Sequence, residues 1–123
     1  MAIQIKPEPL TATSFAPFGD VLDFSGTPDK MINQDMCGRF HDRAILTHSD
    51  GRAGISLFEA APRRLPYRLD MMERHPFGSQ AFLPMTASPF LVIVAHDENG
   101  CPRQPVAFLT EPNMGVNYHA NIW

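Results

Sequence analysis

The sequence predicts an all-β, mainly antiparallel fold with one short helix near the N-terminus. Its 123 residues include 8 glycines and 12 prolines. This excess of turn residues favours many short elements and disfavours a helical bundle. Strand-like segments recur at intervals of roughly 8–12 residues, which is the spacing of sandwiches and barrels. No glycine-rich phosphate loop follows any of them, and this disfavours a nucleotide-binding fold.

The N-terminal half predicts the helix and three strands. The helix is expected within residues 11–18, where Thr11 or Thr13 can cap it, Pro17 interrupts it and Gly19 ends it. Strands are expected where apolar and polar residues alternate with a period of two. These segments are residues 21–24, 55–61 and 67–72.

The C-terminal half carries the stronger strand signals. Residues 90–95 form a continuous apolar run, expected to be buried on both faces, and Asp97-Glu98-Asn99-Gly100 then predicts a tight turn. Further strands are expected at residues 80–83, 106–109 and 116–119. An aromatic side chain is normally buried, so Trp123 is expected to pack back onto the domain unless the chain continues beyond it.

Composition excludes several classes of protein. A chain of 123 residues predicts one domain, and a net charge of −3 without a basic patch argues against nucleic acid as the main partner. Cys37 and Cys101 are too few for a disulfide scaffold, so reduced thiols in a cytoplasmic protein are expected. The N-terminal MAIQIKPEPL lacks an apolar core of signal-peptide length. The longest apolar run of the chain, residues 90–95, is too short for a membrane helix, which needs about 20 residues.

The first candidate for chemistry is the segment 73–80. If Glu73 ends a strand, Glu73 and His75 share a face, and Gln80 opens the next strand after a turn. A carboxylate, an imidazole and an amide can then converge at a barrel mouth, a donor set that suits a borderline divalent cation. The alternative is that Glu73 and Arg74 are solvated and His75 is a turn residue.

The second candidate is the segment 115–119. Asn117 and His119 share a face of the predicted strand, while Tyr118 points the other way. A second imidazole here can complete a site with His75. The alternative is a structural histidine whose hydrogen bonds are satisfied within the strand. The sequence contains no serine-hydrolase elbow, no His-Glu-x-x-His pair and no Cys-x-x-Cys.

Both segments belong to longer motifs. Residues 72–85 read MERHPFGSQAFLPM, and residues 115–123 read GVNYHANIW. The two motifs closely resemble the signature of the ureidoglycolate lyase family, long called ureidoglycolate hydrolase. Residues 18–21, 32–33 and 39–42 add supporting similarity, so that the resemblance spans nearly the whole chain.

The resemblance implies a cupin-like β-barrel or jelly roll, a homodimer and a single domain over residues 1–123. It also implies a C-terminal truncation, because family members continue past the equivalent of Trp123 with further strands. In place of the usual cupin metal ligands, this chain has Glu73, His75, Gln80 and His119. A divalent metal such as nickel is therefore expected to bind weakly or to be dispensable.

The resemblance further implies cleavage of (S)-ureidoglycolate to glyoxylate and urea in allantoin degradation. His75 or His119 is expected to be the base, and Glu73 to orient a histidine or bind the metal. Gln80 and Asn117 are expected to bind the ureido amide or the hydroxyl, with Tyr118 and Arg74 as further substrate-binding candidates. Two alternatives remain, namely another cupin enzyme acting on a small hydroxy acid and a non-catalytic module that binds small anions.

Overall fold

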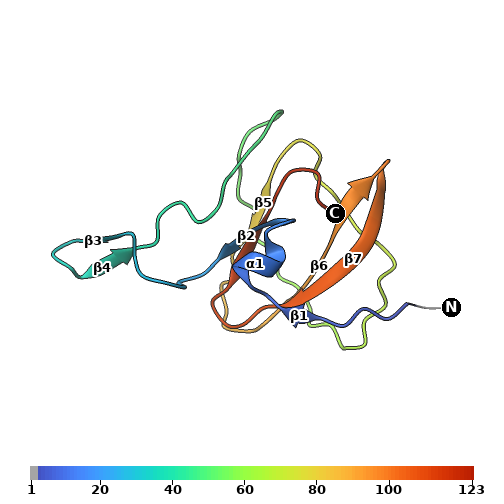
Figure 1. The fold of residues 1–123 in the computed structure, drawn as a ribbon, viewed down its shortest axis with the longest axis horizontal. Helices are drawn as coiled ribbons and strands as arrows, with labels where there is room; N and C mark the ends of the chain where they lie inside the picture. The colour runs from blue at the N-terminus through green and yellow to red at the C-terminus, as the bar shows by residue number, and fades with distance from the viewer. Residues whose placement is uncertain (1–2) are drawn as a thin grey trace.

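The computed structural model describes residues 3–123 and confirms the all-β prediction (Figure 1). Met1 and Ala2, the first residues of the N-terminal stretch assessed above for a signal peptide, lie outside it. No helix in the described part of the chain is long and apolar enough to cross a bilayer. The elements are β1 (Glu8–Pro9), α1 (Ala12–Phe15), β2 (Gly19–Leu22), β3 (Lys30–Ile32), β4 (Cys37–Arg39), β5 (Gln80–Phe82), β6 (Leu91–Glu98), β7 (Cys101–Leu109) and β8 (Gly115–Tyr118).

Two three-stranded sheets form the body of the molecule. One has the order β1-β7-β6 and the other the order β2-β8-β5, and every pairing is antiparallel except β1 with β7. The β3–β4 hairpin projects away from this body (Figure 1). In the second sheet, β8 lies between β2 and β5, so that a strand near the C-terminus is held between two segments from earlier in the chain.

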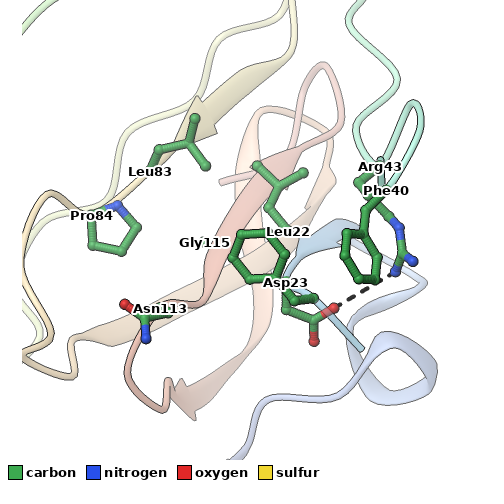
Figure 2. Close-up of a pocket in the computed structure, with 9 residues that line it drawn as sticks. Leu22, Asp23, Phe40, Arg43, Leu83, Pro84, Asn113 and Gly115 are labelled. Atoms are coloured by element: carbon green, nitrogen blue, oxygen red, sulfur yellow. Dashed lines mark ion pairs between the residues drawn. The ribbon is translucent and has the colours of Figure 1, made fainter. Parts of the chain in front are cut away.

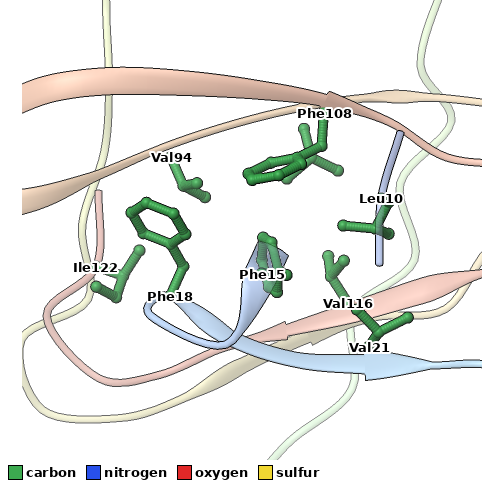
Figure 3. Close-up of a cluster of buried hydrophobic side chains, with 9 residues drawn as sticks. Leu10, Phe15, Phe18, Val21, Val94, Phe108, Val116 and Ile122 are labelled. Atoms are coloured by element: carbon green, nitrogen blue, oxygen red, sulfur yellow. The ribbon is translucent and has the colours of Figure 1, made fainter. Parts of the chain in front are cut away.

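The hydrophobic core lies between the two sheets and includes the Phe15 side chain of α1 (Figure 3). Phe15 of α1 is fully buried and contacts Phe108 of β7 edge to face, with ring centroids 5.4 Å apart. Val94 of β6 and Val116 of β8 are also fully buried. Apolar burial of this kind is the main favourable contribution to folding. It also fixes which face of each strand points inward.

Two local predictions are confirmed. The Thr11 side chain accepts a hydrogen bond from the Ser14 amide at 3.0 Å, forming the expected helix cap. Asn99 and Gly100 have φ values of 54° and 83° in the turn between β6 and β7, as a tight hairpin with the twist of its strands requires. The strands expected at 80–83, 90–95, 106–109 and 116–119 also form, with shifted ends. Burial of 90–95 on both faces is only partial, since Leu91 and Ile93 remain half-buried.

The strands predicted at residues 55–61 and 67–72 are wrong. The structure describes both segments, and neither forms a strand. Ile55 is 95% exposed and Met71 is 71% exposed. A period-two pattern shows only that a segment suits a sheet; the strand forms when a partner supplies the hydrogen bonds. No partner strand within residues 3–123 is paired with either segment.

Trp123 packs back onto the domain. Its backbone N–H donates to the Ala95 carbonyl at 3.0 Å, and its carbonyl accepts from the Ala95 N–H at 3.1 Å. The indole N–H donates to Asp97 at 3.0 Å, while the Arg74 guanidinium lies over the ring, 5.1 Å from its centroid. Arg74 also pairs with Asp97 at 3.1 Å and donates to the Asn121 side chain at 2.8 Å. One guanidinium therefore fastens residues 121–123 to β6.

Replacing Arg74 by alanine should loosen this attachment without removing the tryptophan. Trp123 is the only tryptophan of the chain, so its fluorescence reports directly on the contact. We expect Arg74→Ala to shift the emission to longer wavelength and to increase quenching by acrylamide, because the ring loses its cation–π partner. Arg68→Ala, at an exposed position nearby in the sequence, is the control. An Arg74→Ala spectrum identical to that of the wild type would show that the guanidinium does not hold the indole.

Candidate functional site

The candidate site begins with a side-chain contact between β2 and β8. The register places Asp20 directly opposite Asn117. Directly opposed residues share a sheet face, and the Asn117 side-chain N–H₂ donates to Asp20 Oδ2 at 3.0 Å. The same N–H₂ donates to the Ile45 carbonyl at 3.0 Å, and the Ile45 N–H donates to Asp20 Oδ2 at 2.9 Å. These bonds fix the loop around Ile45 against the face of the sheet that lies opposite the core.

Gly19 allows the two strands to approach this closely. A Cβ atom at position 19 would collide with the Asn117 carbonyl oxygen, which is backbone and cannot move aside like a side chain. A glycine next to Asp20 therefore sets the distance at which the carboxylate meets the amide.

The Asp20 carboxyl is held in its ionised form. Burial acts to raise its pKa, but the hydrogen bonds from Ile45 and Asn117, together with His119, outweigh this effect. The pKa of Asp20 therefore lies below its usual value. At neutral pH the group is a carboxylate that only accepts hydrogen bonds.

His119 lies beside this carboxylate. Its Nε2 atom is 3.5 Å from Asp20 Oδ1, the oxygen that neither Ile45 nor Asn117 uses. The His119 backbone N–H donates to the Phe18 carbonyl at 2.9 Å, so that the residue is anchored to the start of β2. Asn117 and His119 thus share a face, as the alternation predicted. The imidazole is 44% exposed, which leaves part of it open to a small molecule.

Asn117 also presents an unsatisfied acceptor. The residue is fully buried, and its Oδ1 atom finds no hydrogen-bond partner among residues 3–123. The orientation of the amide follows from its neighbours, since a carboxylate and a carbonyl both require the N–H₂ side. Buried acceptors are normally paired, and this one lies where solvent does not reach it.

Gln80 and Tyr118 belong to the opposite face of the same sheet. The register pairs Gln80 with Tyr118, whereas Ala81 pairs with Asn117. The Tyr118 ring packs 5.2 Å from Phe82 and 6.2 Å from Phe15, on the core side. Burial raises the pKa of Tyr118 to about 12, so it stays neutral. The structure does not bring Gln80 and Tyr118 to the face that carries His119.

The segment around His75 lies next to the end of β8. The Asn121 N–H donates to the His75 carbonyl at 2.9 Å. The side chains of Glu73 and His75 are exposed, while Arg74 between them is half-buried against Asp97 and Trp123. The backbones of the two motifs therefore meet as expected. The Arg74 side chain, expected from the resemblance to bind substrate, instead contacts Asp97, Trp123 and Asn121.

The metal expected from the resemblance does not fit the donors that the structure brings together. Within residues 3–123, no group of three or more histidine, cysteine, aspartate or glutamate side chains is close enough to hold a metal ion. Glu73, His75 and His119 are therefore not such a group, and Gln80 faces the other way. Weak or dispensable binding of a divalent metal such as nickel stays a prediction.

Two hollows lie near these residues. One, of about 190 Å³, is lined by residues on both sides of the junction between the motifs, including His48, Pro76 and Ala120. His119 itself does not line it, although Ala120, the next residue in the chain, does. A second, of about 350 Å³, opens at the other end of β2 and β8, where Arg43 pairs with Asp23 at 3.8 Å (Figure 2).

Comparison with known proteins identifies the family. A family model described as ureidoglycolate lyase matches residues 2–123. The chain belongs to the ureidoglycolate lyase family. A family member from Rhodobacter capsulatus, named ureidoglycolate lyase, is 58% identical over 117 residues, which cover 94% of this chain and 73% of that protein. One from Mesorhizobium japonicum with the same name is 47% identical over 122 residues, covering 98% and 75%. The protein named ureidoglycolate lyase 2 from Rhizobium meliloti is 46% identical over 123 residues, covering 98% and 76%.

Analysis of the sequence missed Asp20 as part of this site. It noted the segment 18–21 only as supporting similarity to the ureidoglycolate lyase family. The usable signal was an acidic residue after a glycine, early in a strand and within a segment resembling the family. The loop around Ile45 gives no such signal, because it contributes only backbone atoms to the site.

The pH dependence of stability should reveal the Asp20 carboxylate. Because its folded pKa lies below the usual 3.8, ionised Asp20 stabilises the fold fully above that value and progressively less as pH falls through the folded pKa. We expect the unfolding free energy of the wild type to exceed that of Asp20→Asn at neutral pH, with the gap shrinking below pH 3.8. Urea denaturation across this range measures it. A difference in unfolding free energy that stays constant from about pH 6 to about pH 2 would contradict a lowered pKa of Asp20 in the folded state.

Proposed function

We propose that this chain is a ureidoglycolate lyase that cleaves (S)-ureidoglycolate to glyoxylate and urea. Membership of the family and relatives carrying that name support the activity. The observation that assigns the chemistry to residues is the imidazole of His119, partly exposed and 3.5 Å from an ionised aspartate. Ala120, the next residue in the chain, lines the hollow where the two family motifs meet.

The reaction is an elimination in which no water is consumed. In the substrate, one carbon carries a hydroxyl, a urea nitrogen and a carboxylate. A base removes the hydroxyl proton, the C–O bond becomes a carbonyl, and the C–N bond breaks with its electron pair going to nitrogen. A proton delivered to that nitrogen releases urea. The enzyme must therefore supply one proton acceptor and one proton donor near the same carbon.

His119 is assigned as the group that removes the hydroxyl proton. An imidazole titrates near neutral pH and can accept a proton and then return it, so one side chain can serve both steps. After the first step and before the second, the ring is an imidazolium, which the negative charge of Asp20 stabilises. Asn117 is fully buried, so its part in this proposal is to hold the Asp20 carboxylate and not to touch the substrate. Glu73 and His75, exposed nearby, remain candidates for contact with the substrate.

The wider setting is also part of the proposal. The substrate and products place the enzyme in the breakdown of allantoin, a purine product. Two free, exposed cysteines support a reducing compartment such as the cytoplasm. Large apolar side chains exposed between residues 45 and 71 support a homodimer, because apolar patches of that kind mark association surfaces.

Turnover should depend on His119. Replacing His119 by alanine removes the proton acceptor, and general acid–base catalysis contributes roughly 10²–10⁴ in rate, so we expect kcat to fall at least about tenfold. Urea release from (S)-ureidoglycolate measures this. His41→Ala, which removes an exposed histidine after the β3–β4 hairpin, is the control and should leave the rate unchanged.

Three results would contradict parts of the proposal. Unchanged turnover in His119→Ala would remove His119 from the mechanism. Cleavage of other small hydroxy acids in preference to ureidoglycolate, or tight glyoxylate binding without turnover, would instead support the alternative functions.

A further inference from the structure

We propose that Asp20 is a positioning residue for His119, which holds the imidazole with its proton on Nε2 and leaves Nδ1 to accept the hydroxyl proton of the substrate. This inference rests on the proposed function, because it names the atom of His119 that acts. It adds a residue far from both family motifs in the sequence, brought to the site by the pairing of β2 with β8.

The Asp20 carboxylate is itself firmly oriented. Two donors, the Ile45 N–H at 2.9 Å and the Asn117 N–H₂ at 3.0 Å, both bind Oδ2. The other oxygen, Oδ1, is therefore left to face His119 Nε2 at 3.5 Å. This contact is long for a hydrogen bond, but catalytic hydrogen bonds are often long without substrate and tighten when it binds.

The backbone of His119 is fixed on both sides. Its N–H donates to the Phe18 carbonyl at 2.9 Å, and its carbonyl accepts from the Ile122 N–H at 3.3 Å. Phe18 lies two residues before Asp20, so the same stretch of chain positions both partners. The aspartate side chain is 21% exposed and the imidazole 44%, so that the carboxylate lies deeper than the ring it contacts.

The tautomer follows from the chemistry of the two groups. An ionised carboxylate only accepts hydrogen bonds, so a hydrogen bond between the two groups places the imidazole proton on Nε2. In a neutral imidazole the remaining nitrogen, Nδ1, then has the free lone pair. When Nδ1 takes the hydroxyl proton, the ring becomes a cation beside Asp20. When Nδ1 passes that proton to the departing nitrogen of urea, the ring returns to its starting state.

Replacing Asp20 by asparagine should invert this tautomer. Ile45 N–H and Asn117 N–H₂ both require an acceptor at the Oδ2 position, so the new side chain must place its carbonyl there. Its N–H₂ then faces Nε2 and drives the imidazole proton to Nδ1, which removes the base. We expect kcat to fall roughly a hundredfold or more with KM changed less than about threefold.

The test combines ring ¹⁵N NMR of His119 with steady-state kinetics on the same proteins. The wild type should show a proton on Nε2, and Asp20→Asn should show it on Nδ1. Asp23→Asn is the matched control, because Asp23 has the same 21% exposed side chain on the same stretch of chain but pairs with Arg43. That variant should keep the wild-type tautomer and kcat.

The possible outcomes separate this inference from the proposed function. A wild-type proton on Nδ1 would overturn the inference without any variant being made. Asp20→Asn with wild-type kcat would do the same while leaving the lyase activity in place. A wild type with the expected tautomer but no turnover of ureidoglycolate would overturn the proposed function and with it the catalytic role of Nδ1.

Discussion

The contact between the Asp20 carboxylate and the Asn117 amide is the interaction on which the rest of the site depends. It joins β2 to β8 on the face opposite the core and fastens the loop around Ile45 through two further hydrogen bonds. It also leaves one carboxylate oxygen free to face His119. A single, partly buried polar network thus fixes a loop, two strands and an imidazole relative to one another.

The two faces of the β2-β8-β5 sheet perform different tasks. On the inner face, Val116 and Tyr118 pack into the core with Phe15. On the outer face, Asn117 and His119 meet Asp20. Strand alternation therefore directs neighbouring side chains of one short segment to the core and to the proposed site. A second attachment, the Arg74 guanidinium between Asp97 and Trp123, holds the chain that follows His119.

The sequence predicted what depends on local pattern and missed what depends on long-range pairing. The helix cap at Thr11, the turn at Asn99-Gly100 and the shared face of Asn117 and His119 are local and are confirmed. Asp20 was missed because it meets Asn117 across 97 residues of chain. The register that turns Gln80 away from His119 was equally invisible, since a shift of one residue exchanges the faces of a strand.

A double-mutant cycle in unfolding free energy tests most directly whether Asp20 and Asn117 act as one unit. The cycle compares Asp20→Ala, Asn117→Ala and the double variant with the wild type by urea denaturation. Groups joined in one hydrogen-bond network give coupling energies of about 0.5–3 kcal/mol, and we expect a value in the upper half of that range. The two single variants each lose some unfolding free energy. If the sum of these losses equals the loss of the double variant within about 0.3 kcal/mol, the two residues are independent, which would contradict their action as one unit.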